Sequence, residues 1–221
     1  MKLISILGLG IFGSSVAKTL SNFEDVEIIA VDQDERNIER VSSFVTQGVV
    51  GDITDFDLLK EIGLGDCDIV VVATGSHLES SILAIMHAKN LGVPKIVAKA
   101  KNRSYMQIYK QIGADEIIRP EKEMGEKLAH ELVRRHIIDV IELDDSHSVV
   151  EFIVPDKWVG KSVEVLDLRS NYAMNVIGIR KSLEDQLNVS FRPNYVFTKG
   201  ELVVAITDSK KFETADYLNK L

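Results

Sequence analysis

Three glycines at the spacing Gly8-x-Gly10-x-x-Gly13 form the motif with the clearest chemistry in this sequence. They follow the apolar run 2–7 and precede the helical segment 14–20, a context typical of a turn that binds the phosphates of a dinucleotide. Gly8 would permit the tight turn, Gly10 the approach of backbone to phosphate, and Gly13 the close packing of helix on strand. The helix N-terminus would supply N–H donors and positive potential, so phosphate would need no lysine here.

An acidic residue ends the second apolar run. Asp32 lies 19 residues beyond Gly13, where a carboxylate can accept hydrogen bonds from both ribose hydroxyls. The carboxylate would repel a 2′-phosphate, which disfavours NADP, whereas ATP, ADP, AMP and NAD all offer the same adenosine ribose. The alternative is that the glycines serve packing alone and that Asp32 caps the following helix.

Other polar positions end other apolar runs, and ligands of open α/β sheets bind at the carboxyl ends of strands. Asp52 is expected to border an adenine. Ala73, Thr74 and Gly75 are expected to approach the nucleotide through their backbone. Lys99 is expected to meet either a phosphate or an acidic neighbour. For each position the alternative is a turn residue or a solvated charge.

The elements that must position these residues alternate in type. Short runs rich in Val and Ile are separated by longer segments of helical spacing, and the runs lie at 2–7, 26–31, 44–50, 68–74, 95–100 and 115–119. This alternation predicts an α/β fold with a Rossmann-type, doubly wound, mostly parallel sheet. From Pro120, a favoured first helical residue, apolar residues recur at intervals of four and predict one amphipathic helix.

The pattern changes near residues 137–139. Strands are expected at 138–143, 148–154, 175–180 and 202–207, with a short helix at 163–168 and a closing helix at 209–220. We therefore predict a nucleotide-binding domain over 1–137, whose last element is the helix 120–136, and a smaller α+β domain over 138–221.

Composition excludes several classes of protein. The single cysteine, Cys67, excludes a disulfide framework and fits a cytosolic setting. No run of apolar residues approaches the length of about 18 that a membrane-spanning helix requires. We therefore expect no direct membrane insertion. The net charge of −8 argues against nucleic acid as a partner. Residues 139–221 contain one histidine, His147, and no metal-ligand cluster, so we expect that the protein is not an enzyme. Two alternative functions are a small NAD-dependent oxidoreductase and a soluble nucleotide sensor.

Longer strings add a family resemblance. The stretch 51–76, the string IVAKA at 96–100 and the string GADEIIRPEKEMGEKLA at 113–129 are similar to the Ktr/Trk-type potassium-uptake regulators, which contain RCK domains. RPEKEMG at 119–125 is the most specific part. The resemblance implies a non-enzymatic gating subunit in the cytoplasm, beneath a potassium-translocating membrane partner. It also implies a dimer that exchanges the crossover helix 120–136, and four dimers in an octameric ring.

The resemblance also implies ligands in the first domain. The family's nucleotide positions match Gly8, Gly10, Gly13, Asp32, Lys99 and Glu121 of this chain. Glu121 resembles a carboxylate that the family places near the nucleotide phosphates, sometimes with a divalent cation as its ligand. Within the glycine turn, Ile11 precedes Phe12 and replaces an arginine that many relatives carry. ATP selectivity is therefore open, and ADP, AMP and NAD(H) are candidate ligands beside ATP.

For the second domain, the resemblance implies cyclic di-AMP as an effector that closes the transporter. Arg169 matches a phosphate-contacting arginine and Asn175 an adenine-contacting position, and the apolar walls would be Met174, Val176, Ile177 and Pro193. One arginine from each subunit would neutralise the two phosphates across a two-fold axis. The alternative is a helix-end arginine beside core aliphatic residues.

Overall fold

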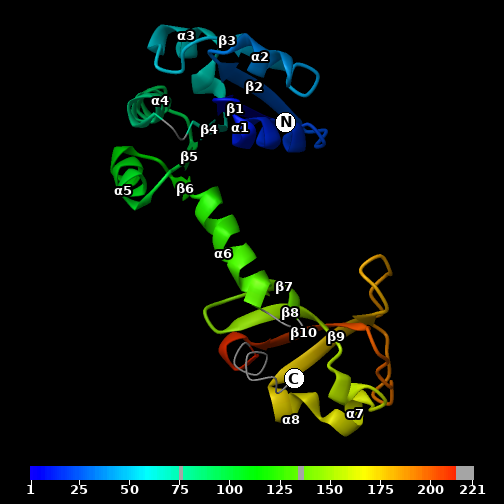
Figure 1. Ribbon diagram of the computed structural model, residues 1–221. Coiled ribbons are helices and arrows are strands. Elements are labelled where there is room, and N and C mark those ends of the chain that lie inside the picture. Colours follow the sequence, from blue (N-terminus) through cyan, green and yellow to red (C-terminus); the bar gives the residue numbers. More distant parts are fainter. Residues whose placement is uncertain (75–76, 134–136, 213–221) are drawn as a thin grey trace. The chain divides into compact units, whose positions relative to one another are not determined.

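The computed structural model describes residues 1–74, 77–133 and 137–212, and of residues 130, 131 and 133 it describes only the backbone (Figure 1). Its contacts divide the chain into two compact units, Met1–Glu123 and Met124–Leu221. The division falls inside helix α6 (Pro120–Val133), whereas the domain boundary expected from the sequence lies at 137–138. That boundary stays a prediction.

The first unit contains a six-stranded sheet in the order β3-β2-β1-β4-β5-β6. Its strands are β1 (Lys2–Leu7), β2 (Val26–Asp32), β3 (Gln47–Val50), β4 (Ile69–Val72), β5 (Lys95–Lys99) and β6 (Glu116–Ile118). All neighbours pair in parallel. The strand order reverses between β1 and β4, so their carboxyl ends form the crevice where such sheets bind ligands. The predicted doubly wound fold is confirmed.

Helices cover both faces of this sheet. They are α1 (Ile11–Leu20), α2 (Glu35–Glu39), α3 (Phe56–Glu61), α4 (Leu78–Asn90) and α5 (Arg103–Ile112). One apolar cluster joins the sheet to α1 and α2 through Ala17 and Ile38. A second joins the other face to α3, α4 and α5 through Leu59, Ile85 and Tyr109. The strands are apolar on both faces because both are covered.

The third strand is shorter than the sequence predicts. The run 44–50 enters the sheet only at Gln47, because the amide of Phe44 donates to the carbonyl of Val41 in a turn at 2.8 Å. The apolar ring of Phe44 lies instead beneath the ammonium of Lys18, at 5.4 Å from the ring centroid. Its hydrophobicity therefore signals packing against α1 and not strand pairing.

The second unit contains a four-stranded antiparallel sheet in the order β7-β8-β10-β9. The strands are β7 (Ile137–Glu142), β8 (His147–Ile153), β9 (Met174–Arg180) and β10 (Leu202–Asp208). Its core gathers aromatic rings around the fully buried Trp158. This smaller antiparallel unit confirms the expected α+β second domain.

The helical part of this unit differs from the prediction. The helix expected at 163–168 is two short helices, α7 (Val163–Leu166) and α8 (Leu168–Tyr172), because Asp167 adopts a left-handed φ of 40° between them. Of the closing helix expected at 209–220, residues 209–212 are helical and the rest lie outside the described residues. Within the described ranges, no helix has the length and hydropathy required to cross a bilayer.

Candidate ligand-binding sites

The glycine turn joins β1 to α1 in the geometry that its spacing predicts. Gly8 has φ +96°, which glycine adopts without strain. A Cβ on Gly13 would lie 2.0 Å from the carbonyl oxygen of Gly8, so only glycine permits this approach of helix and turn. A Cβ on Gly10 would meet nothing within 4 Å. Gly8 and Gly13 therefore shape the turn, while Gly10 leaves open space at the start of the helix.

Among the described residues, no side chain caps the backbone donors in the first turn of α1. The N-cap residue, Gly10, has no side chain to accept from them. Ile11 is 96% exposed, and Phe12 is half-buried against the cluster beneath α1. Free N–H groups at a helix N-terminus attract anions, and this turn contains no acidic residue that would compete for them.

Asp32 ends β2 with its carboxylate beside the turn. It is 9% exposed. One carboxylate oxygen accepts from the amide of Leu9 at 2.6 Å, and the other accepts from the amide of Asp34 at 2.9 Å and from the side chain of Asn37 at 3.0 Å. Asp34, and not Asp32, caps α2 through the amide of Arg36. The capping alternative for Asp32 is therefore wrong, and Asp32 fixes the glycine turn to the end of β2.

The end of β4 abuts the same turn. A Cβ on Gly8 would lie 3.2 Å from the amide nitrogen of Thr74, and a Cβ on Gly13 would lie 3.1 Å from the Cβ of Ala73. Gly75, the third residue predicted here, lies outside the described residues. Asp52 is exposed and accepts from the amide and the hydroxyl of Thr54, each at 2.8 Å. Its carboxylate thus caps a turn, as the alternative interpretation holds.

Lys99 ends β5 and meets an acidic neighbour. Its ammonium lies 2.5 Å from a carboxylate oxygen of Glu121, the second residue of α6, and 5.7 Å from the centroid of the Phe12 ring. The Lys99 side chain is 16% exposed and that of Glu121 is 70% exposed. The hydrogen bond from Lys99 lowers the pKa of the Glu121 carboxyl. Of the two roles open for Lys99, this structure shows the pairing with a carboxylate.

The described residues contain no group of three or more His, Cys, Asp or Glu side chains that could hold a metal ion. Glu121 alone supplies too few ligands for a cation that is bound by protein groups only. A hard cation such as Mg²⁺ commonly binds one or two carboxylates together with nucleotide phosphates. Glu121 therefore fits a cation only where nucleotide phosphates supply further ligands.

In the second unit, a hollow of about 420 Å³ collects the residues of the other predicted site. Arg169, Met174, Asn175, Val176 and Pro193 all line it. Ile177 does not line it. It is the extra residue of a β-bulge between the pairs Val176↔Ala205 and Gly178↔Val204. The sequence reading missed Val163, Glu164, Asp167, Leu168 and Phe191, which complete the lining.

Backbone geometry explains how these residues meet. Asp167 and Ala173 have left-handed φ values of 40° and 52° and bracket α8, so the chain turns sharply before and after Arg169. The amide of Glu164 donates to the carbonyl of Pro193 at 2.9 Å and fixes the opposite wall. The side chain of Arg169 forms no hydrogen bond or ion pair with another described residue. Its guanidinium is therefore available to an anion.

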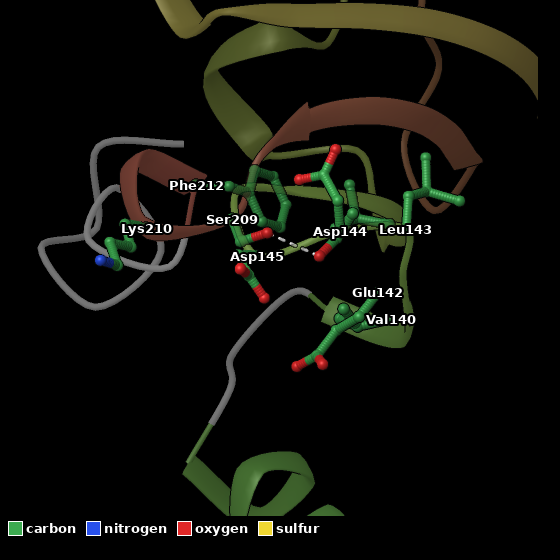
Figure 2. Close-up of a pocket in the computed structure, with 10 residues that line it drawn as sticks. Val140, Glu142, Leu143, Asp144, Asp145, Ser209, Lys210 and Phe212 are labelled. Atoms are coloured by element: carbon green, nitrogen blue, oxygen red, sulfur yellow. Dashed lines mark hydrogen bonds between the residues drawn. The ribbon is translucent and has the colours of Figure 1, made fainter.

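Another hollow of about 550 Å³ lies between the β7–β8 hairpin and the helical residues 209–212 (Figure 2). Asp144 is exposed at its rim, but the carboxylate already accepts from the amides of Ser146 and His147 at 2.7 and 2.8 Å, which lowers its pKa. The hydroxyls of Ser148 and Ser209 bond each other at 2.7 Å. These polar groups serve the local fold, and we assign no ligand here.

Known structures share the fold at low sequence identity. The GsuK channel matches with a TM-score of 0.69 and 15% identity, covering 98% of this chain and 39% of that chain. The GsuK channel bound to NAD matches with a TM-score of 0.66 and 15% identity over the same shares. GsuK bound to ADP matches 57% of this chain and 33% of its own, with a TM-score of 0.51 and 14% identity. This chain thus spans less than half of each of those channels, and the likeness establishes the RCK fold.

Sequence comparison shows the family. Residues 4–120 match the model of the TrkA-N domain and residues 149–217 that of the TrkA-C domain. The Ktr system potassium uptake protein C of Bacillus subtilis is 35% identical over 96% of both chains, and protein A of that organism is 31% identical over the same shares. Protein A of Vibrio alginolyticus is 32% identical over 83% of both chains. The chain therefore belongs to the family of the Ktr system potassium uptake proteins.

Proposed function

We propose that this protein is the cytoplasmic gating subunit of a potassium-uptake system. The observation that carries the proposal is the 35% identity to a Ktr potassium uptake protein over 96% of both chains. In this role it binds an adenine nucleotide in the first domain and acts on a potassium-translocating membrane subunit of the Ktr/Trk type. The occupancy of its ligand sites then biases the open population of that partner.

The nucleotide site lies at the carboxyl ends of β1, β2, β4 and β5. The unpaired amides of α1 receive the phosphates, and the carboxylate of Asp32 receives the ribose. ADP, ATP and NAD(H) all satisfy these contacts. The related fold of GsuK has been solved with NAD and with ADP, which supports this ligand class. With a nucleotide bound, a divalent cation would bridge its phosphates and Glu121.

The proposed assembly is a dimer that exchanges the crossover helix, with four dimers in an octameric ring. Met124, Leu128 and Leu132 recur every four residues along α6, and their exposed fractions are 61%, 54% and 76%. Such a stripe of apolar side chains lowers its free energy by packing against a second copy. This stripe supports the dimer.

The proposed effector of the second domain is cyclic di-AMP. The hollow around Arg169 combines an unpaired guanidinium with apolar walls from Met174, Val176 and Pro193. Two hollows related by a two-fold axis would offer two guanidinium groups to the two phosphates of one ligand. Binding between two copies would favour one arrangement of the dimer, and we expect that arrangement to close the transporter.

The test is calorimetric titration of the full chain with cyclic di-AMP and, separately, with ADP and NADH. We expect one cyclic di-AMP per dimer. Arg169→Ala should abolish that binding and leave ADP affinity unchanged, because the two sites lie in different domains. The matched control is Arg192→Ala, since Arg192 is exposed and does not line the hollow. Loss of both ligands in Arg169→Ala, or of neither, contradicts the assignment.

Partner identity separates this proposal from a soluble nucleotide sensor. A gating subunit should co-purify with a potassium-translocating membrane protein and alter potassium uptake in vesicles that contain it. Co-purification with soluble proteins alone would favour the sensor.

A further inference from the structure

The ammonium of Lys99 faces two competing anionic positions. It lies beside Phe12, in the first turn of α1, where the proposed phosphates bind, and it also contacts Glu121 at 2.5 Å. One ammonium cannot fully neutralise both a carboxylate and a phosphate group. Without nucleotide, Glu121 holds this charge.

The burial of the two partners is unequal. Lys99 is 16% exposed and rests against an aromatic ring, so its ammonium is largely withdrawn from water and depends on a bound anion. Glu121 is 70% exposed, so water can solvate its carboxylate when the contact opens. Lys99 is therefore the fixed member of the pair, and Glu121 is the replaceable one.

We propose, on the basis of the nucleotide site proposed above, that Lys99 exchanges partners when nucleotide binds. In the free protein it holds Glu121, and in the bound protein it holds a phosphate oxygen, so nucleotide binding releases the first turn of α6 from the end of β5. Glu121 thus acts as a built-in competitor of the phosphates. Once released, its carboxylate is free to share a cation with them.

The start of α6 should survive this exchange. The Glu123 carboxylate accepts from the amide of Arg119 at 3.0 Å, and the amide of Glu123 donates to the carbonyl of Arg119 at 3.0 Å. These contacts do not involve Lys99. The exchange therefore loosens one side-chain contact between β5 and α6 without unwinding the helix, which is the element that leads into the second domain.

The test is ADP affinity measured by calorimetry on the full chain in EDTA, which removes divalent cations. Glu121→Gln should bind ADP about fivefold more tightly than the wild type, the size expected for loss of one partly exposed ion pair. Adenosine, which has no phosphate, should bind both proteins equally. The matched control is Glu116→Gln, which breaks a 2.7 Å pair with Lys95 at the other end of β5 and should leave ADP affinity unchanged.

A double mutant separates exchange from simple repulsion. Removing the Glu121 charge would also reduce its repulsion of phosphate, but that gain would persist without Lys99. Exchange predicts that Lys99→Met weakens ADP binding and that Glu121→Gln has no further effect in that background. Unchanged or weaker ADP binding by the single Glu121→Gln variant, or the same gain in both backgrounds, overturns the proposal. Wild-type protein that binds neither ADP nor adenosine would instead overturn the nucleotide site itself.

Discussion

The glycine turn of the first domain and the Arg169 hollow of the second differ in what their residues do without ligand. Gly13 and Asp32 hold the turn together, through a contact that excludes any Cβ and through a carboxylate that accepts from Leu9. The side chain of Arg169 forms no hydrogen bond or ion pair with a described residue. The first site is therefore inseparable from the fold around it, whereas the arginine of the second can be replaced without loss of a hydrogen bond or ion pair to another described residue.

The largest effect should come from Gly13→Val. Its Cβ would lie 2.0 Å from the backbone oxygen of Gly8, so α1 must move away from the turn. We expect a loss of about 3 kcal/mol or more in the free energy of unfolding, together with loss of ADP binding. Urea denaturation measures the first effect and calorimetry the second.

Gly10→Ala is the matched control for Gly13→Val, because a Cβ on Gly10 meets no atom within 4 Å. It should change the free energy of unfolding by less than about 1 kcal/mol and still weaken ADP binding, since the methyl group occupies the space of the phosphate. Equal stability losses in the two variants would remove the distinction between glycines that shape the turn and a glycine that faces ligand.

A smaller effect is expected from Asp32→Asn. The amide group can still accept from Asp34 and Asn37, but the buried amide of Leu9 then loses its acceptor. We expect a loss of about 2 kcal/mol in the free energy of unfolding and about tenfold weaker ADP binding. Asp34→Asn is the control, because asparagine caps a helix as well as aspartate does. Unchanged ADP affinity in Asp32→Asn would refute a role for Asp32 at the ribose.

The difference between the glycine turn and the Arg169 hollow also explains which features the sequence predicts. Gly8, Gly13 and Asp32 occupy positions where only those residue types satisfy the backbone, so their spacing carries the geometry. Strand and helix alternation is likewise local, and it predicts the sheet to within a few residues at most ends. The prediction that Phe44 begins the third strand was wrong because an apolar side chain packs equally well beside a strand and within one.

Local sequence patterns do not predict contacts between residues that are far apart in the chain. Nothing local indicates that Lys99 pairs with Glu121, or that Phe191 and Glu164 share a wall with Arg169, because the fold alone brings them together. The left-handed Asp167, which splits the expected helix 163–168, was also missed, since aspartate adopts that conformation only occasionally and its presence does not signal a break in a helix.

The smallest effect concerns Tyr195 of the second domain, which packs against Phe191 of the hollow but does not line the hollow itself. Burial, followed by the hydrogen bond to Glu201, raises the pKa of Tyr195 to about 12 from 10.0. Its hydroxyl donates to the Glu201 carboxylate at 2.6 Å, and the amide of Thr198 donates to the other oxygen at 2.8 Å. Because the folded-state pKa is raised, the folded protein retains this proton between pH 10 and 12, and stability falls as pH rises through that window.

Tyr195→Phe should therefore cost about 1 kcal/mol in the free energy of unfolding at neutral pH and flatten the alkaline decline between about pH 10 and 12. Fluorescence of Trp158, the one tryptophan of the chain, reports on this domain because its ring is fully buried there. Tyr105→Phe alters a tyrosine of the first unit and should leave the Trp158 transition unchanged. An undiminished alkaline decline in Tyr195→Phe would show that the stability of this domain does not depend on the Tyr195 proton. A flattened decline would locate that dependence at a residue beside the hollow and not in its lining.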